Sequence, residues 1–229
     1  MSKSLSIALM FVVCMLVFAA GCSQPAGKTV VTPTVTIAVP NSSATQDAFN
    51  AIPRAPLNAS ETADILYLQE AEKFERDLNN ALYGMHNDLP VFLQIANSAQ
   101  VYMVADNVIL QRYGIPNPEK DAAGSFTNPT LQQMYNADIN SGQSSAMDAL
   151  KYSATFEDLH IADLQSAIGR TDNSDLQFIY RQELASSRNN LRAINQWITA
   201  YGGTYTPTYI TKSYYNEIIS TPVEQVPVK

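Results

Sequence analysis

The stretch FEDLHIADL, residues 156–164, places a glutamate and a histidine three residues apart within a run of helical apolar periodicity. On a helix, residues at this spacing lie on the same side, and their side chains can touch. A Glu-x-x-His pair supplies half of the dinuclear metal site in many four-helix bundles. Glu157 and His160 are therefore the first candidates for metal ligands in this chain.

The apolar periodicity gives these two residues different positions on their helix. Its buried seam runs through Met147, Leu150, Ala154, Glu157, Ile161, Leu164 and Ile168. Glu157 lies at the centre of that face, where a carboxylate is unfavourable unless it is paired or bound to a metal. His160 is rotated by about 60° from Glu157, since each helical residue turns by about 100°. We therefore expect His160 at the edge of the face, hydrogen bonded locally to Glu157.

Four long amphipathic segments predict an all-α fold. They cover residues 60–85, 90–113, 145–168 and 174–201, and residues 129–138 form a further candidate helix. The short links HNDL and GRTDN join these segments into two antiparallel hairpins, and residues 114–143 form a long crossover between the hairpins. This arrangement is typical of ferritin-like four-helix bundles. We expect the Tyr-rich C-terminal tail to pack over one end of the bundle.

Polar residues at the mid-height of the helices provide further candidate ligands. On the four segments these are Glu72, Glu75, Asp106, Glu157, His160 and Glu183. A ferritin-like dinuclear site takes one Glu from each of two helices and a Glu-x-x-His pair from each of the other two. The positions expected to hold those pairs are Ala99 and Tyr102 on the second segment and Ser187 and Asn190 on the fourth. None of these four residues is a histidine, so the expected ligand set is incomplete.

At these residues the sequence resembles the ferritin-like domain of unknown function 2202. The segments that carry the resemblance, in order along residues 66–219, include LQEAEKFERDLNNALYGMHNDLPVFLQIANSAQ, GSFTNPTLQQMYN, DLHIADL and SSRNNLRAI. The resemblance implies a ferritin-like four-helix fold, and metal binding by superfamily membership. Glu72 and Glu157 match the family pattern. Members commonly carry Glu-x-x-His where this chain has Ala99 and Tyr102, and His where it has Asn190.

Two hypotheses about function follow from these residues. The first is a metal-free bundle with a binding or structural role at the cell surface, without catalytic residues or a cofactor. In that case we expect the Tyr102 hydroxyl to reach Glu157 in the space that ions would occupy. The alternative is a metal-dependent redox enzyme or metal-binding protein with altered ligands. It would hold iron or manganese through Glu72, Glu75, Glu157 and His160, joined by Asp106 or Glu183.

The N-terminal residues predict export and a membrane anchor. Lys3 precedes the uncharged run LSIALMFVVCMLVFAAG, which is slightly shorter than the roughly 20 residues of a membrane-spanning helix. AAGC then resembles a lipoprotein cleavage motif, so we expect a signal peptide over residues 1–21 and a lipid on Cys22. The alternative is an uncleaved N-terminal helix. Residues 22–57, rich in Thr, Pro and Val, predict a flexible tether that holds domain 58–229 at the outer face of the membrane.

Composition excludes several other classes of protein. The formal net charge is −7, and no basic cluster is present that would neutralise nucleic-acid phosphates. The two cysteines are Cys14, within the apolar run, and Cys22. The domain that follows has no thiol, which excludes disulfides, cysteine-based metal sites and thiol catalysis there. The membrane is therefore the one partner that the sequence predicts, and it identifies no protein partner.

Overall fold

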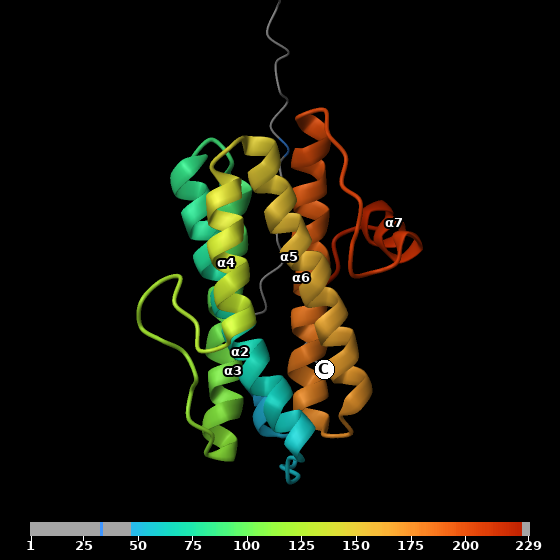
Figure 1. The fold of residues 1–229 in the computed structure, drawn as a ribbon. Helices are drawn as coiled ribbons and strands as arrows, with labels where there is room; N and C mark the ends of the chain where they lie inside the picture. Colours follow the sequence, from blue (N-terminus) through green and yellow to red (C-terminus); the bar gives the residue numbers. More distant parts are fainter. Residues whose placement is uncertain (1–32, 34–46, 226–229) are drawn as a thin grey trace, which may run out of the picture. The chain divides into compact units, whose positions relative to one another are not determined.

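The structure is a computed structural model that describes residue 33 and residues 47–225 (Figure 1). The helices are α2 (Ala59–Met85), α3 (Pro90–Tyr113), α4 (Pro129–Gly142), α5 (Ala146–Arg170), α6 (Ser174–Ala200) and α7 (Lys212–Ser220). No strand occurs within these described ranges, which confirms the all-α class. The predicted signal peptide, Cys22 and the tether up to residue 46, apart from residue 33, lie outside the described residues.

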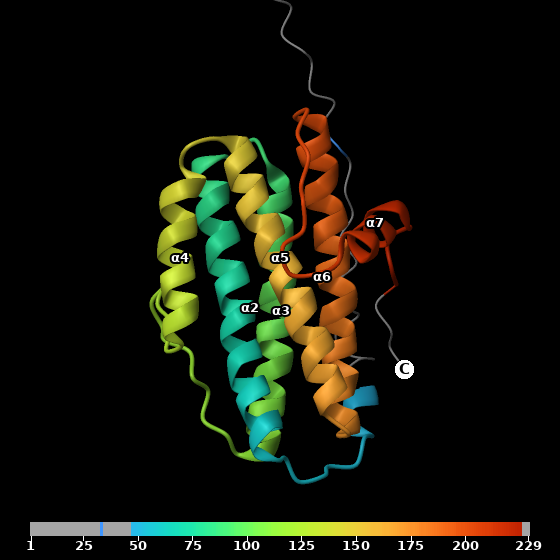
Figure 2. The ribbon, with the colours of Figure 1, turned by 45° about the vertical axis from the view of Figure 1, so that its right-hand side comes forward.

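The four long helices form two hairpins around a shared interior. α2 pairs with α3, and α5 pairs with α6, while α2 also contacts α5 and α3 contacts α6. Each long helix therefore has two long neighbours, and one face of each is turned inward (Figures 1 and 2). The crossover between the hairpins carries α4, which packs against α2 and α5. The predicted order of two hairpins and one long connection is present.

Capping residues explain where the helices begin and end. Asn58 caps α2 by accepting a hydrogen bond from the Glu61 N–H, and the Glu61 carboxylate accepts the Asn58 N–H in return. α2 therefore begins at Ala59, just before the predicted start at Ser60. Pro90 begins α3 as predicted. Proline has no backbone N–H, and an N–H at the first helical position would have no intrahelical acceptor, so no hydrogen bond is lost there. α5 continues through Gly169, where we expected it to stop, since the Thr171 N–H still bonds to the Ala167 carbonyl.

Two apolar clusters fill the bundle interior at different heights. One includes Leu78, Leu82, Phe92, Ile95, Leu150, Ile194 and Trp197. The other includes Ile65, Leu68, Ile109, Leu110, Leu164, Leu176 and Tyr180. On α2 and α5, Glu72 and Glu157 lie between residues of the two clusters, so a polar layer interrupts the apolar core.

The crossover is fastened to α2 by hydrogen bonds to a buried ion pair within that helix. The Lys73 Nζ lies 2.6 Å from Asp77 Oδ2, and both side chains are almost fully buried. The same Asp77 oxygen accepts the N–H of Gly124 at 2.9 Å. Gly124 has φ +70°, and a Cβ there would overlap the Tyr135 ring. Glycine is therefore required at this turn, for its backbone angle as well as for space.

The C-terminal tail packs along the side of the bundle, and the expectation that it covers one end was wrong. Figures 1 and 2 show α7 beside α6. Asp158 of α5, fully buried, accepts the backbone N–H groups of Thr208, Tyr209 and Ile210. A buried carboxylate on the flank of α5 therefore draws the chain back alongside the helices, because such a charge needs several donors.

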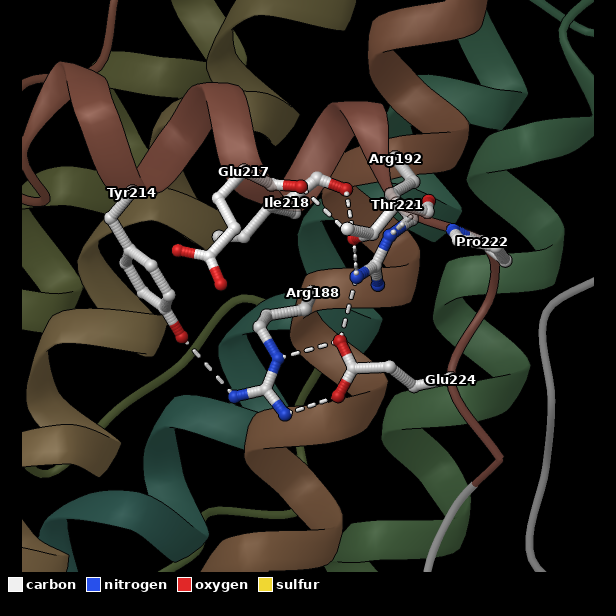
Figure 3. Close-up of a pocket in the computed structure, with 8 residues that line it drawn as sticks. All are labelled: Arg188, Arg192, Tyr214, Glu217, Ile218, Thr221, Pro222 and Glu224. Atoms are coloured by element: carbon white, nitrogen blue, oxygen red, sulfur yellow. Dashed lines mark hydrogen bonds and ion pairs between the residues drawn. The ribbon is translucent and has the colours of Figure 1, made fainter.

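Glu224 completes the attachment of the tail in a pocket between α6 and α7 (Figure 3). Its Oε1 accepts hydrogen bonds from Arg188 Nε and from Arg192 Nη2, each at 2.7 Å. Asn189 adds two bonds to the Glu224 backbone. Burial opposes ionisation of Glu224, but the two arginines outweigh burial and lower its pKa. The carboxylate is therefore ionised at neutral pH and is fully paired.

Residues before α2 also contact the bundle. Phe49 is 2% exposed, with its ring 4.9 Å below the Arg112 guanidinium and 6.3 Å from the Phe178 ring. Part of the segment predicted as the tether, residues 47–57, therefore contacts the bundle through a buried aromatic ring. Within the part of the chain that the structure describes, no helix is both long and apolar enough to cross a membrane.

Replacing Glu224 should loosen the tail while the bundle stays folded. Glu224→Gln keeps the backbone bonds to Asn189 but removes the charge that the two arginines share. Its side chain is 30% exposed, so we expect a loss of about 1 kcal/mol of local stability. Hydrogen exchange should speed up across α7 and stay unchanged in α2 and α3. Glu217→Gln, an exposed change in the same pocket, is the control, and equal exchange in both variants would contradict this account.

Candidate metal centre

A layer of polar side chains lies inside the bundle, with contributions from all four long helices. Each of its members is 2% exposed or less, and the set is Glu72 and Glu75 of α2, Asp106 of α3, Glu157 and His160 of α5, and Glu183 and Asn190 of α6. Carboxylates are almost never buried this fully without a partner. Five of them in one layer therefore call for a specific compensation.

Three side chains of this layer that could act as metal ligands converge on one point. The His160 Nε2 lies 3.0 Å from Glu72 Oε1, which joins α5 to α2. One ligand atom each of Glu72, His160 and Glu183 all lie within 4.8 Å of one another. Atoms at such separations can coordinate a single ion, because metal–oxygen and metal–nitrogen bonds of about 2 Å span them.

The other carboxylates face one another in pairs. Glu75 faces Glu157, and Asp106 faces Glu183, each at a separation that allows a hydrogen bond when one partner is protonated. Asn190 Nδ2 donates to Glu75 Oε1 at 2.9 Å. In contrast, neither oxygen of Asp106, Glu157 or Glu183 has a hydrogen-bond donor among the described residues. Two ionised carboxylates cannot bond to each other, so a proton or a cation must lie between them.

No arginine or lysine of the described residues forms an ion pair with these five carboxylates. Burial raises the pKa of Glu75 to about 8, with the charge of Glu72 adding to the shift. Burial likewise raises the pKa of Asp106 to about 7, and the pKa values of Glu72, Glu157 and Glu183 well above their usual range. The metal-free layer therefore holds protons at neutral pH.

His160 is well prepared to act as a ligand. Burial lowers its pKa, which outweighs the opposing effect of nearby carboxylates such as Glu75. The ring is therefore neutral at pH 7 and offers a free lone pair. It stacks on the Phe156 ring, with centroids 5.7 Å apart, so its orientation is fixed by packing.

The structure brings together the four residues named for the metal-binding alternative, since His160 bonds to Glu72 and Glu75 faces Glu157. One expectation about them was wrong. His160 is fully buried and bonds to Glu72 on another helix, whereas we expected a local hydrogen bond to Glu157. The reason is that α2 packs against α5, so a residue at the edge of the α5 seam points at a neighbouring helix.

Tyr102 was expected to reach Glu157, and this was also wrong. Its hydroxyl donates to the backbone carbonyl of Gln182 at 3.2 Å. The carboxylates of α3 and α6 come instead from Asp106 and Glu183, which lie one helical turn from Tyr102 and Ser187. Both residues were already among the polar candidates at mid-height, and a step of one turn keeps a side chain on the same face of a helix.

Gln69 was not among the residues predicted for the site, yet it is fully buried on α2 and its Oε1 has no hydrogen-bond partner among the described residues. It lies three residues before Glu72, and the helical spacing to this candidate ligand was the signal that would have identified it. Its amide nitrogen donates to the Met103 carbonyl of α3 and to the Glu119 carboxylate of the crossover. The polar layer is therefore connected to residues outside it.

The geometry defines an all-helical protein with a buried carboxylate and histidine cluster. Residues 61–222 match the family described as an uncharacterized protein domain (DUF2202). The chain belongs to this family. It is 40% identical over 178 residues to the uncharacterized protein MJ0754 of Methanocaldococcus jannaschii, with 77% of this chain and 96% of that protein covered.

A solved structure supports the same relationship. The crystal structure of hypothetical protein MJ0754 from Methanococcus jannaschii superposes with a TM-score of 0.74 at 40% identity. The match covers 76% of this chain and 99% of the solved chain. The helical arrangement described above is therefore similar to one determined by crystallography.

Stability of the metal-free protein should decrease as pH rises. The raised pKa values mean that the folded state binds more protons than the unfolded state between about pH 4.5 and pH 8. Stability is therefore full below the unfolded pKa values and is lost as pH passes the folded values near 7 and 8. Thermal unfolding of protein treated with a chelator, followed by circular dichroism from pH 5 to pH 8.5, measures this. A melting temperature that rises steadily over the range would contradict it.

Proposed function

We propose that this chain is a ferritin-like metal-binding protein that holds two divalent ions, iron or manganese, between its four long helices. The observation that carries the proposal is the convergence of Glu72, His160 and Glu183 on one point beside carboxylates without donors. Five ionised carboxylates would carry five negative charges, and two divalent ions would balance four of them. The arrangement of two hairpins and a crossover, with ligands at mid-height, supports the ferritin-like class.

The residues divide into two groups of ligands. Glu72, His160 and Glu183 would hold one ion, with Asp106 facing Glu183. Glu75 and Glu157, which face each other, would hold the second. Asn190 keeps Glu75 in place by donating to one of its oxygens, and Phe156 keeps the His160 ring in place by stacking.

Ligand chemistry favours iron or manganese. Carboxylate oxygens suit manganese and similar hard cations, and imidazole nitrogen suits iron among others. The first hypothesis, a metal-free bundle, was suggested by the missing histidines at Tyr102 and Asn190. Asp106 and Glu183 weigh against it, because they restore carboxylates from α3 and α6. A bound iron or manganese ion would supply one-electron redox chemistry, in a site that the protein shields from water.

Metal content tests this proposal directly. The metal-free full-length chain is exposed separately to Fe²⁺ and Mn²⁺, desalted, and analysed by mass spectrometry. We expect close to two ions per chain in the parent and a loss of at least one ion in Glu183→Gln. The variant should also be more stable than the parent without metal at pH 8, because it removes a buried carboxylate that lacks a donor.

Glu70→Gln is the matched control for these measurements. Glu70 is also buried, but its carboxylate lies outside the layer and accepts the backbone N–H groups of Thr127 and Asn128. Glutamine keeps one acceptor there, so metal content should match that of the parent. Folded parent protein that retains no ion under any of these conditions would overturn the proposal and favour the metal-free binding role.

We further propose that Cys22 carries a lipid that anchors the chain to the outer face of a membrane. The support is the uncharged run after Lys3 and the AAGC motif. Cells expressing the chain would be fractionated, and the membrane-bound form weighed by mass spectrometry. We expect a cleaved, lipidated form, and Cys22→Ser should abolish its lipid. A full-length, unmodified chain that remains in the membrane in both cases would favour the uncleaved helix instead.

A further inference from the structure

An ion must cross the protein to reach the buried layer. The inference about its route rests on the proposed function. Glu72 is 2% exposed, and Asp106 and Glu183 are 0% exposed. Apolar clusters lie on both sides of the layer along the bundle. An ion that sheds its water in an apolar cluster would meet a large barrier, so entry requires polar groups between the surface and the layer.

Gln69 provides such a group. It is fully buried, and its Nε2 donates to the Met103 carbonyl at 3.2 Å, which places it where α2 meets α3. Gln69 precedes Glu72 by one helical turn, and Met103 precedes Asp106 by one turn. Its Oε1 is buried without a hydrogen-bond partner. A free amide oxygen is an acceptable ligand for a passing cation.

Glu119 extends this polar connection towards the surface. It lies on the crossover before α4 and is half-buried, and its Oε1 accepts a hydrogen bond from Gln69 Nε2 at 2.5 Å. The Asn117 side chain accepts the Glu119 N–H and so fixes the loop. Burial is the main cause of the raised pKa of Asp106, and the charge of Glu119 adds to it. The two carboxylates are therefore close enough to interact.

Other polar groups offer a less suitable connection. Asn79 and Ser153 are buried and bonded to each other, and Asn79 also bonds to the Glu75 carbonyl, so their polar atoms are engaged. Asp163 is half-buried three residues after His160, but its Oδ2 is engaged by the Tyr67 hydroxyl. The connection through Glu119 differs from these two because it contains a buried amide oxygen, that of Gln69, which has no hydrogen-bond partner in the described part of the chain.

We propose that Glu119 is the residue at which divalent cations first bind, and that they pass the Gln69 amide to reach Glu72 and Asp106. Glu119 attracts cations from solvent because it is a carboxylate at the accessible end of the polar connection. Gln69 lies between that carboxylate and the buried layer and contributes no charge of its own. Glu119 therefore governs the rate of loading, while the residues of the layer determine how much metal is held.

Stopped-flow mixing of the metal-free full-length chain with Co²⁺ tests this, with the visible absorbance of bound cobalt as the signal. Glu119→Gln keeps a hydrogen-bonding side chain but removes the charge. We expect the association rate to fall about tenfold at low salt, the usual scale of electrostatic steering, with the final absorbance unchanged. The rate of the parent should also depend more steeply on salt than the rate of the variant.

Asp163→Asn is the matched control, since Asp163 is also a half-buried carboxylate one helical turn from a proposed ligand. Its loading rate should equal that of the parent. Gln69→Leu provides a second test, and it should slow loading without lowering the final absorbance. Circular dichroism confirms that each variant is folded.

Three results would overturn the entry route. These are an unchanged rate in Glu119→Gln, equal slowing by Asp163→Asn, or a lower final absorbance in Glu119→Gln. The first two would leave metal binding itself intact, since the parent would still bind cobalt. A parent chain that binds no cobalt at all would overturn the proposed function together with the route.

Discussion

Five carboxylates form one buried layer of the bundle with a single imidazole, and no arginine or lysine of the described residues forms an ion pair with them. Ionised together, they would repel one another in surroundings from which water is excluded, so the layer must take up protons or cations. The rest of the bundle accommodates this constraint. The long helices satisfy their own backbone groups as they pass the layer, and apolar clusters on either side supply the burial that stabilises the fold.

Three carboxylates elsewhere in the structure differ from those of the layer in having several hydrogen-bond donors. Asp77, Asp158 and Glu224 are each surrounded by donors, and each fastens a peripheral segment to the bundle. Their role is structural, because every charge has its partner within the chain. Four carboxylates of the layer, those of Glu72, Asp106, Glu157 and Glu183, have oxygens without donors, although they are more deeply buried than Glu224. Native proteins rarely leave such groups unpaired, and this contrast is what supports the proposed metal site.

Under the proposed function, the bundle keeps an interior site with ligands that differ from the expected set. Asn190 stands where family members tend to have His, yet its amide still bonds to Glu75. Asp106 lies one turn from Tyr102, the expected histidine position on α3, and Glu183 lies one turn from Ser187, the expected glutamate position on α6. A side chain displaced by one turn stays on the same face of its helix, so the interior remains within its reach. An incomplete motif is therefore weak evidence that a site has been lost.

The sequence by itself determined the helices and the residues that line their inner faces. Apolar periodicity and caps gave α3 with its observed bounds, and placed Glu157, Asp106 and Glu183 on buried stripes. Those signals are local, because they depend on residues within one or two turns. Tertiary structure alone decided which stripes meet: that His160 faces Glu72, that Tyr102 turns to a backbone carbonyl, and that Gln69 bonds to Glu119. These contacts join residues distant in the chain, and helical period carries no information about the neighbouring helix.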